Sequence, residues 1–302
     1  MVMIYMGMNR ILFVMWMAGI LLLSSCSVKE DRSGCPCWMT VDLSKVAESR
    51  WKSTERQSKT EYQDVTKSLD SRQHIAESVV LRLRGNSDED EVDYAFKMTE
   101  TVNTEVCALE YEVPRGAVGV SVIGMPYRVG HDGIAGYDGD EIRIPVGEQM
   151  DSLYGFFRMF YTRCESVLCD VELHKEFCTV SFTLGDDGYI SPYDLEVWGN
   201  VAGVSPWDLM PLEGDFRFAP SQEDGVYRVR VPRQVDNSLE LVMLEDSEIV
   251  DRLPLGEYIT RSGYDWAAED LADVHIALDM EKQQVMITVS GWDGVVVMDI
   301  VI

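Results

Sequence analysis

The chain has 302 residues, of which 46% are hydrophobic, and its 26 basic and 52 acidic side chains give a formal net charge of −26 at pH 7. This apolar content is sufficient for folded cores and excludes a disordered protein. Since such a surface repels phosphates and anionic headgroups, the charge argues against nucleic acid as a partner and against membrane adhesion through basic residues.

The chain begins with a targeting segment that ends at a cysteine. Arg10 precedes thirteen uncharged residues, 11–23, and Ser24 and Ser25 then lead to Cys26. A basic start, a short apolar run and small residues are typical of a signal peptide. Thirteen helical residues span only ~20 Å, less than a hydrocarbon core of ~30 Å. We therefore expect a lipoprotein signal peptide over residues 1–25 and acyl chains on Cys26; the alternative is an ordinary secretory peptide that contains a cysteine.

A short tether over residues 26–37 is followed by a series of short predicted strands. The predicted strands alternate apolar and polar residues or form short apolar runs, and turns rich in Gly, Asp and Pro separate them. Polar residues 45–73 fit either a loop or a broken helix, and residues 266–271, after Asp265 as N-cap, are the best helix candidate. The predicted strands cover residues 38–43, 78–84, 105–113, 117–123, 167–173, 177–184, 195–198, 226–231, 239–244, 248–252, 274–278, 284–289 and 295–302.

This pattern indicates an all-β fold. Short strands at hairpin spacing, with almost no long amphipathic helix, are typical of β-sandwiches. The length after the tether suits two domains, which we place at residues 38–150 and 151–302.

Six cysteines remain when Cys26 carries lipid. An even number outside the cytoplasm permits disulfides, although the sequence does not choose among the pairings, and buried thiols are the alternative. No metal is expected, because the four histidines are not spaced with the cysteines like a zinc site and the Gly- and Asp-rich residues 131–140 fit a turn better than a calcium loop. The six are Cys35, Cys37, Cys107, Cys164, Cys169 and Cys178.

The sequence contains no recognisable catalytic motif. A nucleophile elbow, a phosphate-binding Gly-rich loop and an HExxH motif are all missing from it, so we expect neither an enzyme nor a cofactor other than the covalent lipid. Aromatic side chains offer a different activity, because exposed rings can stack on sugars, although burial between sheets is their commoner fate. The aromatic candidates are Trp198, Trp207, Tyr264 and Trp266.

The last predicted strand, residues 295–302, is strongly β-prone and apolar. An exposed hydrophobic edge strand favours association, and proteins that add strands use such an edge for binding. Val295, Val297, Ile300 and Ile302 are therefore candidate strand-exchange residues. The alternative is a final strand that packs within its own domain.

Several motifs resemble one family across nearly the whole chain after residue 25. They are Cys-Ser-Val-Lys-Glu-Asp-Arg-Ser-Gly-Cys-Pro-Cys at 26–37, Val-Asp-Leu at 41–43, Asp-Ser-Leu-Tyr at 151–154, Val-Pro-Arg-Gln at 231–234, Pro-Leu-Gly-Glu-Tyr-Ile at 254–259 and Gly-Tyr-Asp-Trp at 263–266. In this order they resemble the FimB-type anchoring subunits of Bacteroides-type fimbriae.

The resemblance implies two tandem transthyretin-like β-sandwiches without catalytic residues. It also implies a surface-exposed lipoprotein of the outer membrane that anchors a fimbria, limits its length and joins the fimbrial shaft subunits by strand exchange. Lys29, Glu30 and Asp31 then correspond to the signal for export to the cell surface. A surface glycan-binding lipoprotein is the second interpretation, and a lipid-anchored hydrolase is the third.

Overall fold

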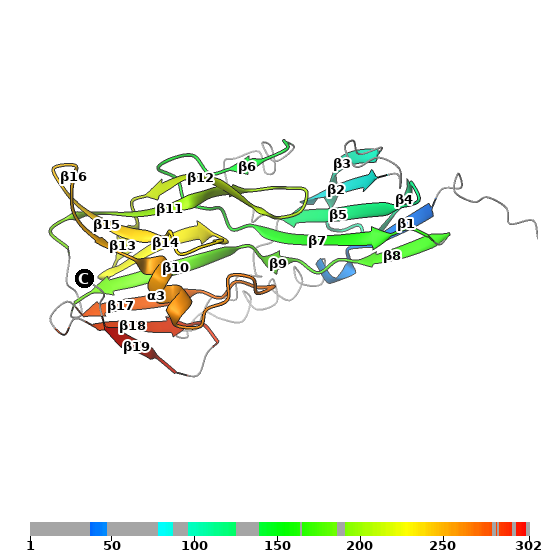
Figure 1. The fold of residues 1–302 in the computed structure, drawn as a ribbon. Helices are drawn as coiled ribbons and strands as arrows, with labels where there is room; N and C mark the ends of the chain where they lie inside the picture. Colours follow the sequence, from blue (N-terminus) through cyan, green and yellow to red (C-terminus); the bar gives the residue numbers. More distant parts are fainter. Residues whose placement is uncertain are drawn as a thin grey trace, which may run out of the picture. The chain divides into compact units, whose positions relative to one another are not determined.

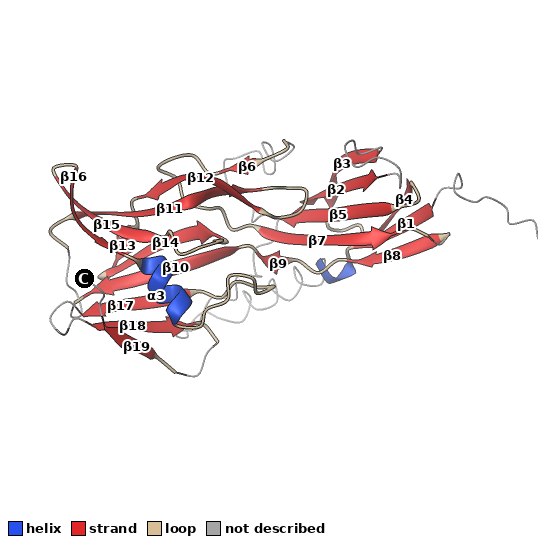
Figure 2. Cartoon of the chain, viewed as in Figure 1, coloured by secondary structure: helices blue, strands red, loops and turns tan. Residues whose placement is uncertain are grey.

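A computed structural model describes residues 37–46, 78–86, 96–124, 139–163, 165–185, 191–279, 282, 284–291 and 294–299. Residues 36–302 form one compact unit. Its described part consists mainly of β-strands in four sheets (Figures 1 and 2), which confirms the predicted all-β class.

The first pair of sheets contains a three-stranded sheet, β4-β1-β8, and a five-stranded sheet, β3-β2-β5-β7-β9. β1 is antiparallel to β4 and parallel to β8. The bounds are β1 (Cys37–Asp42), β2 (Ser78–Asn86), β3 (Phe96–Asn103), β4 (Ala108–Val113), β5 (Ala117–Gly124), β7 (Tyr154–Tyr161), β8 (Ser166–Asp170) and β9 (His174–Lys175).

The second pair contains a six-stranded sheet, β13-β14-β10-β17-β18-β19, and a sheet in the order β12-β11-β15-β16 to which β6 adds by pairing with β11. The bounds are β6 (Ile142–Arg143), β10 (Phe177–Leu184), β11 (Asp194–Val204), β12 (Pro211–Phe218), β13 (Ser221–Glu223), β14 (Val226–Pro232), β15 (Glu240–Glu245), β16 (Glu248–Leu253), β17 (Val274–Asp279), β18 (Gln284–Val289) and β19 (Val296–Asp299).

Strand pairing runs across residues 150 and 151, where we expected one domain to end and the next to begin. β7 pairs with β5, and β8 pairs with β1, whereas β6 pairs with β11 of the second pair of sheets. Because β5 is buried along almost its whole length, it needs a neighbour on each side, and β2 and β7 supply them. Apart from β6, the strands up to β9 pair within the first pair of sheets, and the strands from β10 onward pair within the second.

The strands form where the sequence alternates. Along β1 the buried residues are Cys37, Met39 and Val41, and β10, β17 and β18 show the same two-residue period. This alternation gives each strand one face in the core. The sequence analysis does not predict β3, β7 and β12, nor the short strands β6, β9 and β13. β3 and β12 bury few residues and carry many polar ones, so their period is weak.

The predicted helix at residues 266–271 is wrong, and the helix lies just before it, at α3 (Leu255–Arg261). Leu255, Tyr258 and Ile259 are fully buried. Their spacing of three and four residues places them on one face of a helix, which packs on the core.

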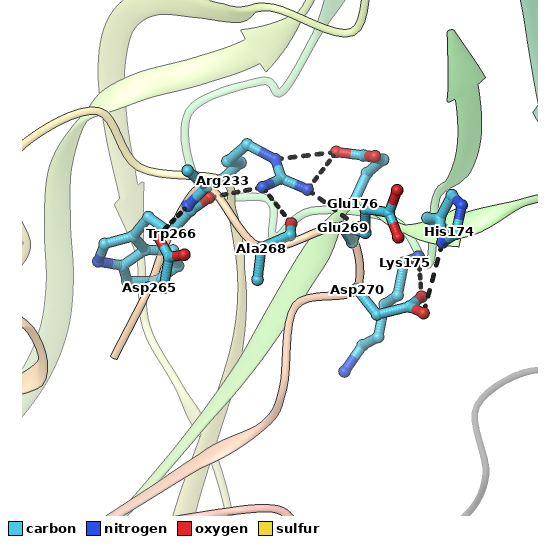
Figure 3. Close-up of polar contacts among 10 residues, drawn as sticks. His174, Lys175, Glu176, Arg233, Asp265, Trp266, Ala268, Glu269 and Asp270 are labelled. Atoms are coloured by element: carbon cyan, nitrogen blue, oxygen red, sulfur yellow. Dashed lines mark hydrogen bonds and ion pairs between the residues drawn. The ribbon is translucent and has the colours of Figure 1, made fainter. Parts of the chain in front are cut away.

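Residues 266–271 do not form a helix, because Arg233 binds their backbone (Figure 3). Arg233 Nη1 donates to the carbonyl oxygens of Trp266 at 2.5 Å and Ala268 at 2.8 Å, and Nη2 donates to that of Glu269 at 3.4 Å. In a helix over 266–271 the carbonyl oxygen of Trp266 would accept the N–H of Asp270; here it accepts the Arg233 guanidinium. Asp265 accepts the N–H of Ala267 two residues on, which is a turn contact.

Residues 205–210, between β11 and β12, connect the two pairs of sheets. The carbonyl of Pro206 accepts a hydrogen bond from Ser121 Oγ on β5 at 2.8 Å. Asp208 pairs with Arg84 of β2 at 3.0 Å. Trp207, between them, is only 8% exposed. This loop therefore fastens β11 and β12 to the five-stranded sheet of the first pair.

Candidate functional site

β19 forms one edge of the six-stranded sheet and pairs antiparallel with β18 (Figure 2). Val296 lies opposite Ile287, Val297 opposite Met286 and Met298 opposite Val285. Within the described residues β18 is the one strand paired with β19, and no described strand pairs with the other side of β19.

The two faces of β19 differ in burial. Val296 and Met298 are half-buried, and Met298 packs against the core. Val297 is 55% exposed and Val295, just before the strand, is 56% exposed. Met286, opposite Val297, is also exposed, so an apolar stripe continues over the outer face of β18 and β19.

The structure therefore places two of the four candidate strand-exchange residues on the exposed side. Ile300 and Ile302 lie outside the described residues. Sequence reasoning missed Val296 and Met298 as the core-facing pair, because a run of apolar residues has no alternation from which to read its two faces. The alternation of β18 could have identified them. Val285 and Ile287 are its buried residues, and they lie opposite Met298 and Val296 of β19.

The opposite edge of the same sheet has a different character. β13 has three residues, all exposed and polar, Ser221–Glu223. A short, charged edge is a common way to prevent unwanted pairing. β19 lacks this protection over Val295–Met298, and an apolar edge with open backbone groups is the geometry at which a partner strand adds to a sheet.

The four aromatic candidates do not share a stacking plane. Trp207 and Tyr264 are buried, and the ring of Tyr264 meets that of Trp266 at 67° with centroids 4.8 Å apart. Trp198, on β11, lies within 4.3 Å of the Arg217 guanidinium and 5.0 Å of that of Arg252. The described residues therefore place no common sugar platform at these positions.

Four of the cysteines lie in the described part. Cys37, Cys169 and Cys178 are buried and Cys107 is exposed; Cys107, Cys169 and Cys178 carry free thiols. Burial raises the pKa of Cys169 and of Cys178 to about 12, so both thiols are protonated at neutral pH.

The remaining N-terminal and cysteine candidates lie outside the described residues: Cys26, Lys29, Glu30, Asp31, Cys35 and Cys164. Within the described ranges, no helix has the length and apolar character needed to cross a membrane. In the same ranges, no group of three or more His, Cys, Asp or Glu side chains is arranged to hold a metal ion.

A serine and a histidine meet on the six-stranded sheet, as a hydrolase would require. Ser181 Oγ lies 3.0 Å from His275 Nδ1 and also contacts the carbonyl oxygen of Val274. Burial, followed by the charge of Arg228, lowers the pKa of His275. The charged neighbour that acts on this histidine is a cation, whereas a hydrolytic triad places a carboxylate there.

The comparisons with known proteins concern the fold. No protein-family model and no curated protein matches the chain in sequence. Its structure is similar to that of a candidate polysaccharide-binding protein from Bacteroides thetaiotaomicron, with a TM-score of 0.52 and 15% identity over 87% of this chain and 98% of that one.

Two further structures align with lower scores. The fimbrial anchor protein Mfa2 from Porphyromonas gingivalis gives a TM-score of 0.47 and 10% identity over 88% of this chain and 100% of that one. A candidate adhesin from Bacteroides ovatus gives a TM-score of 0.46 and 13% identity over 89% of this chain and 97% of that one. At these identities, the Bacteroides thetaiotaomicron structure establishes a shared fold.

Proposed function

We propose that the chain is a non-enzymatic lipoprotein of the outer membrane that anchors a fimbria at the cell surface. Cys26 carries the acyl chains, Lys29, Glu30 and Asp31 direct export, and the first shaft subunit adds a strand along β19. The open apolar edge of β19 is the observation that carries this proposal. The motifs shared with FimB-type anchoring subunits support it.

The physics of both attachments suits such an anchor. Acyl chains contribute about 0.8 kcal/mol for each buried CH₂, so two or more chains give durable attachment. A strand added to β19 would pair with its unpaired backbone groups, and its side chains would contact Val297, which is exposed now. Apolar burial of this kind contributes about 25 cal/mol per Å².

The lipid attachment is tested by Cys26→Ala. If Cys26 anchors the chain, cells with this variant shed fimbriae into the medium, which electron microscopy and blotting of the medium measure. Fimbriae that stay on the cells contradict the anchor. A glycan-binding protein predicts instead that sugar capture is lost while the fimbriae remain.

The strand attachment is tested by deleting residues 295–302, which we expect to abolish co-purification of the shaft subunit while the rest of the fold remains. Val297→Lys is the gentler variant, because Val297 already faces solvent. Gln222→Lys on β13 is its matched control at the opposite edge of the sheet. If the shaft subunit still co-purifies with the deletion variant, β19 does not bind it.

A glycan-binding lipoprotein is the second candidate, and a hollow of about 400 Å³ favours it. Tyr193, Asp194, Glu196 and Pro220 are among its lining residues. An aromatic ring beside carboxylates offers stacking and hydroxyl recognition for a sugar. Loss of binding to capsular glycans in Tyr193→Ala, with fimbrial attachment unchanged, would favour this function over the anchor.

A further inference from the structure

The chain enters its folded unit at one end of the first pair of sheets (Figure 1). At the start of β1, Trp38 lies opposite Ser166, and its N–H donates to the carbonyl oxygen of Glu165 at 2.9 Å. At the end of β7, Tyr161 lies opposite Ala117. We call this surface the tether end; its residues are 37–38, 112–116, 161–163 and 165–166, with Leu168 beside them.

Large apolar and aromatic side chains are exposed at the tether end. Trp38 is 50% exposed, Tyr161 is 70% exposed and Leu168 is 64% exposed. Since Thr40 lies opposite Leu168 and Trp38 opposite Ser166, Trp38 and Leu168 are diagonal neighbours on one face of the three-stranded sheet. Tyr161 belongs to β7 of the five-stranded sheet, where its neighbour Phe160 packs against the core, so Tyr161 points outward from that sheet at the same end. Exposed large apolar side chains mark interaction surfaces.

The charge of the tether end also differs from that of the chain. Its charged residues are two basic ones, Arg115 and Arg163, and two acidic ones, Glu112 and Glu165. Their formal charges sum to zero, whereas the whole chain has a net charge of −26. Arg115 Nη1 donates to the carbonyl oxygen of Arg163 at 3.0 Å, which fastens the two turns to each other. The repulsion of anionic groups is therefore weaker here than the average charge of the chain would cause.

We propose that the tether end rests on the lipid surface, with Trp38, Tyr161 and Leu168 at the level of the headgroups. The proposal rests on the proposed function, because it takes Cys26 as the lipidated residue. Eleven residues, 27–37, separate Cys26 from Trp38, and the connection spans at most ~40 Å. This short connection keeps the tether end close to the membrane and raises its effective concentration there.

The side-chain chemistry matches a headgroup region. Trp and Tyr prefer the boundary between water and hydrocarbon, because their rings are apolar and their N–H or O–H groups need partners. Arginine, of which this end has two, forms charge-assisted hydrogen bonds with phosphate. One lipid anchor strengthened by a second, weaker contact is the usual way to make membrane attachment stable.

The test measures the contact of Trp38 with lipid in the acylated protein. The protein is purified from membranes and reconstituted into phosphatidylcholine vesicles with brominated acyl chains, which quench tryptophan fluorescence on contact. We expect quenching in the wild type, its loss in Trp38→Phe and its retention in Trp198→Phe. Trp198 is the matched control, since it is partly exposed but lies on β11. Circular dichroism of both variants checks that the fold is intact.

The outcomes separate this inference from the anchor itself. Equal quenching in wild type and Trp38→Phe, or no quenching of an acylated wild type, would overturn the contact and leave the lipid anchor standing. Mass spectrometry that finds Cys26 unmodified would overturn both. Quenching that disappears only with Trp38 establishes that the tether end touches the bilayer.

Discussion

Arg233 and Glu176 form an ion pair of 3.0 Å between side chains that are only 18% and 9% exposed. The same guanidinium donates to the backbone carbonyls of Trp266 and Ala268 (Figure 3). One side chain that follows β14 thus connects the residue between β9 and β10 with the segment that leads into β17, and from there to β18 and β19.

Arg233→Ala is expected to lower the free energy of unfolding by about 3–5 kcal/mol, because it leaves the Glu176 carboxylate buried without its cation. Urea denaturation of the purified protein measures this loss. The matched control is Lys45→Ala, which breaks an ion pair with Asp170 between half-exposed side chains and should cost far less, because solvent screens such a pair. Equal losses in the two variants would contradict a special role for Arg233.

The error at residues 266–271 shows where local sequence reasoning ends. Asp265 precedes a short stretch that fits a helix start, but Arg233, more than thirty positions away, binds its carbonyls instead. Such a contact depends on the tertiary fold and has no local signal. The strands that alternate, such as β10 and β18, are predicted with the bounds that the structure has, because burial of one face imposes a two-residue period.

The edge strand β19 is also predicted from the sequence, but the side of it that faces the core is not. A run of valines indicates a strand at residues 295–302, and β19 (Val296–Asp299) lies within that range. Which side chains face the core depends on pairing with β18, and a uniform apolar run does not contain that information.

Glu176 should make stability depend on pH in an unusual direction. Burial raises the pKa of Glu176 above its ordinary 4.5; the charges of Arg233 and His174 oppose this, and Asp270 adds to it. The folded state therefore holds this proton more tightly than the unfolded state, and the contribution is lost as the pH rises through the folded pKa. We expect the stability of wild type relative to Glu176→Gln to fall as the pH rises above the ordinary 4.5 of a glutamate and through the raised folded pKa. Denaturation curves across this range measure it, and parallel pH profiles would contradict it.

Asp236 should show the opposite sign. Hydrogen bonds from the side chain and then the backbone N–H of Ser238, followed by the Asn200 amide, lower the pKa of Asp236 below its ordinary 3.8. Its contribution is present above that value and is lost as the pH falls through the folded pKa. Asp236→Asn is therefore expected to be less stable than wild type at neutral pH, with the difference shrinking in acid. A difference that grows on acidification would show that these hydrogen bonds do not favour the carboxylate.

The thiols should differ in reactivity according to burial. Cys107 is exposed and is expected to react with iodoacetamide in the native protein. Cys169 and Cys178 are buried, and burial raises the pKa of each to about 12, so both should react only after unfolding. Peptide mapping after labelling with and without urea distinguishes the sites. Native labelling of Cys178, or protection of Cys107, would contradict the structure.

Trp207 should be the most sensitive residue of the loop that joins the two pairs of sheets. Its ring is 8% exposed and lies 4.4 Å from Lys97 Nζ, and its Nε1 donates to Asp140 at 3.0 Å. Trp207→Ala removes this packing and is expected to cost about 3–5 kcal/mol. Trp207→Phe keeps an aromatic ring but loses the hydrogen bond to a largely exposed carboxylate. It should therefore destabilise the protein much less than Trp207→Ala does, because water can replace that hydrogen bond. Thermal unfolding of both variants measures the order. If Phe destabilises as much as Ala does, the hydrogen bond to Asp140 rather than the buried ring holds the loop in place.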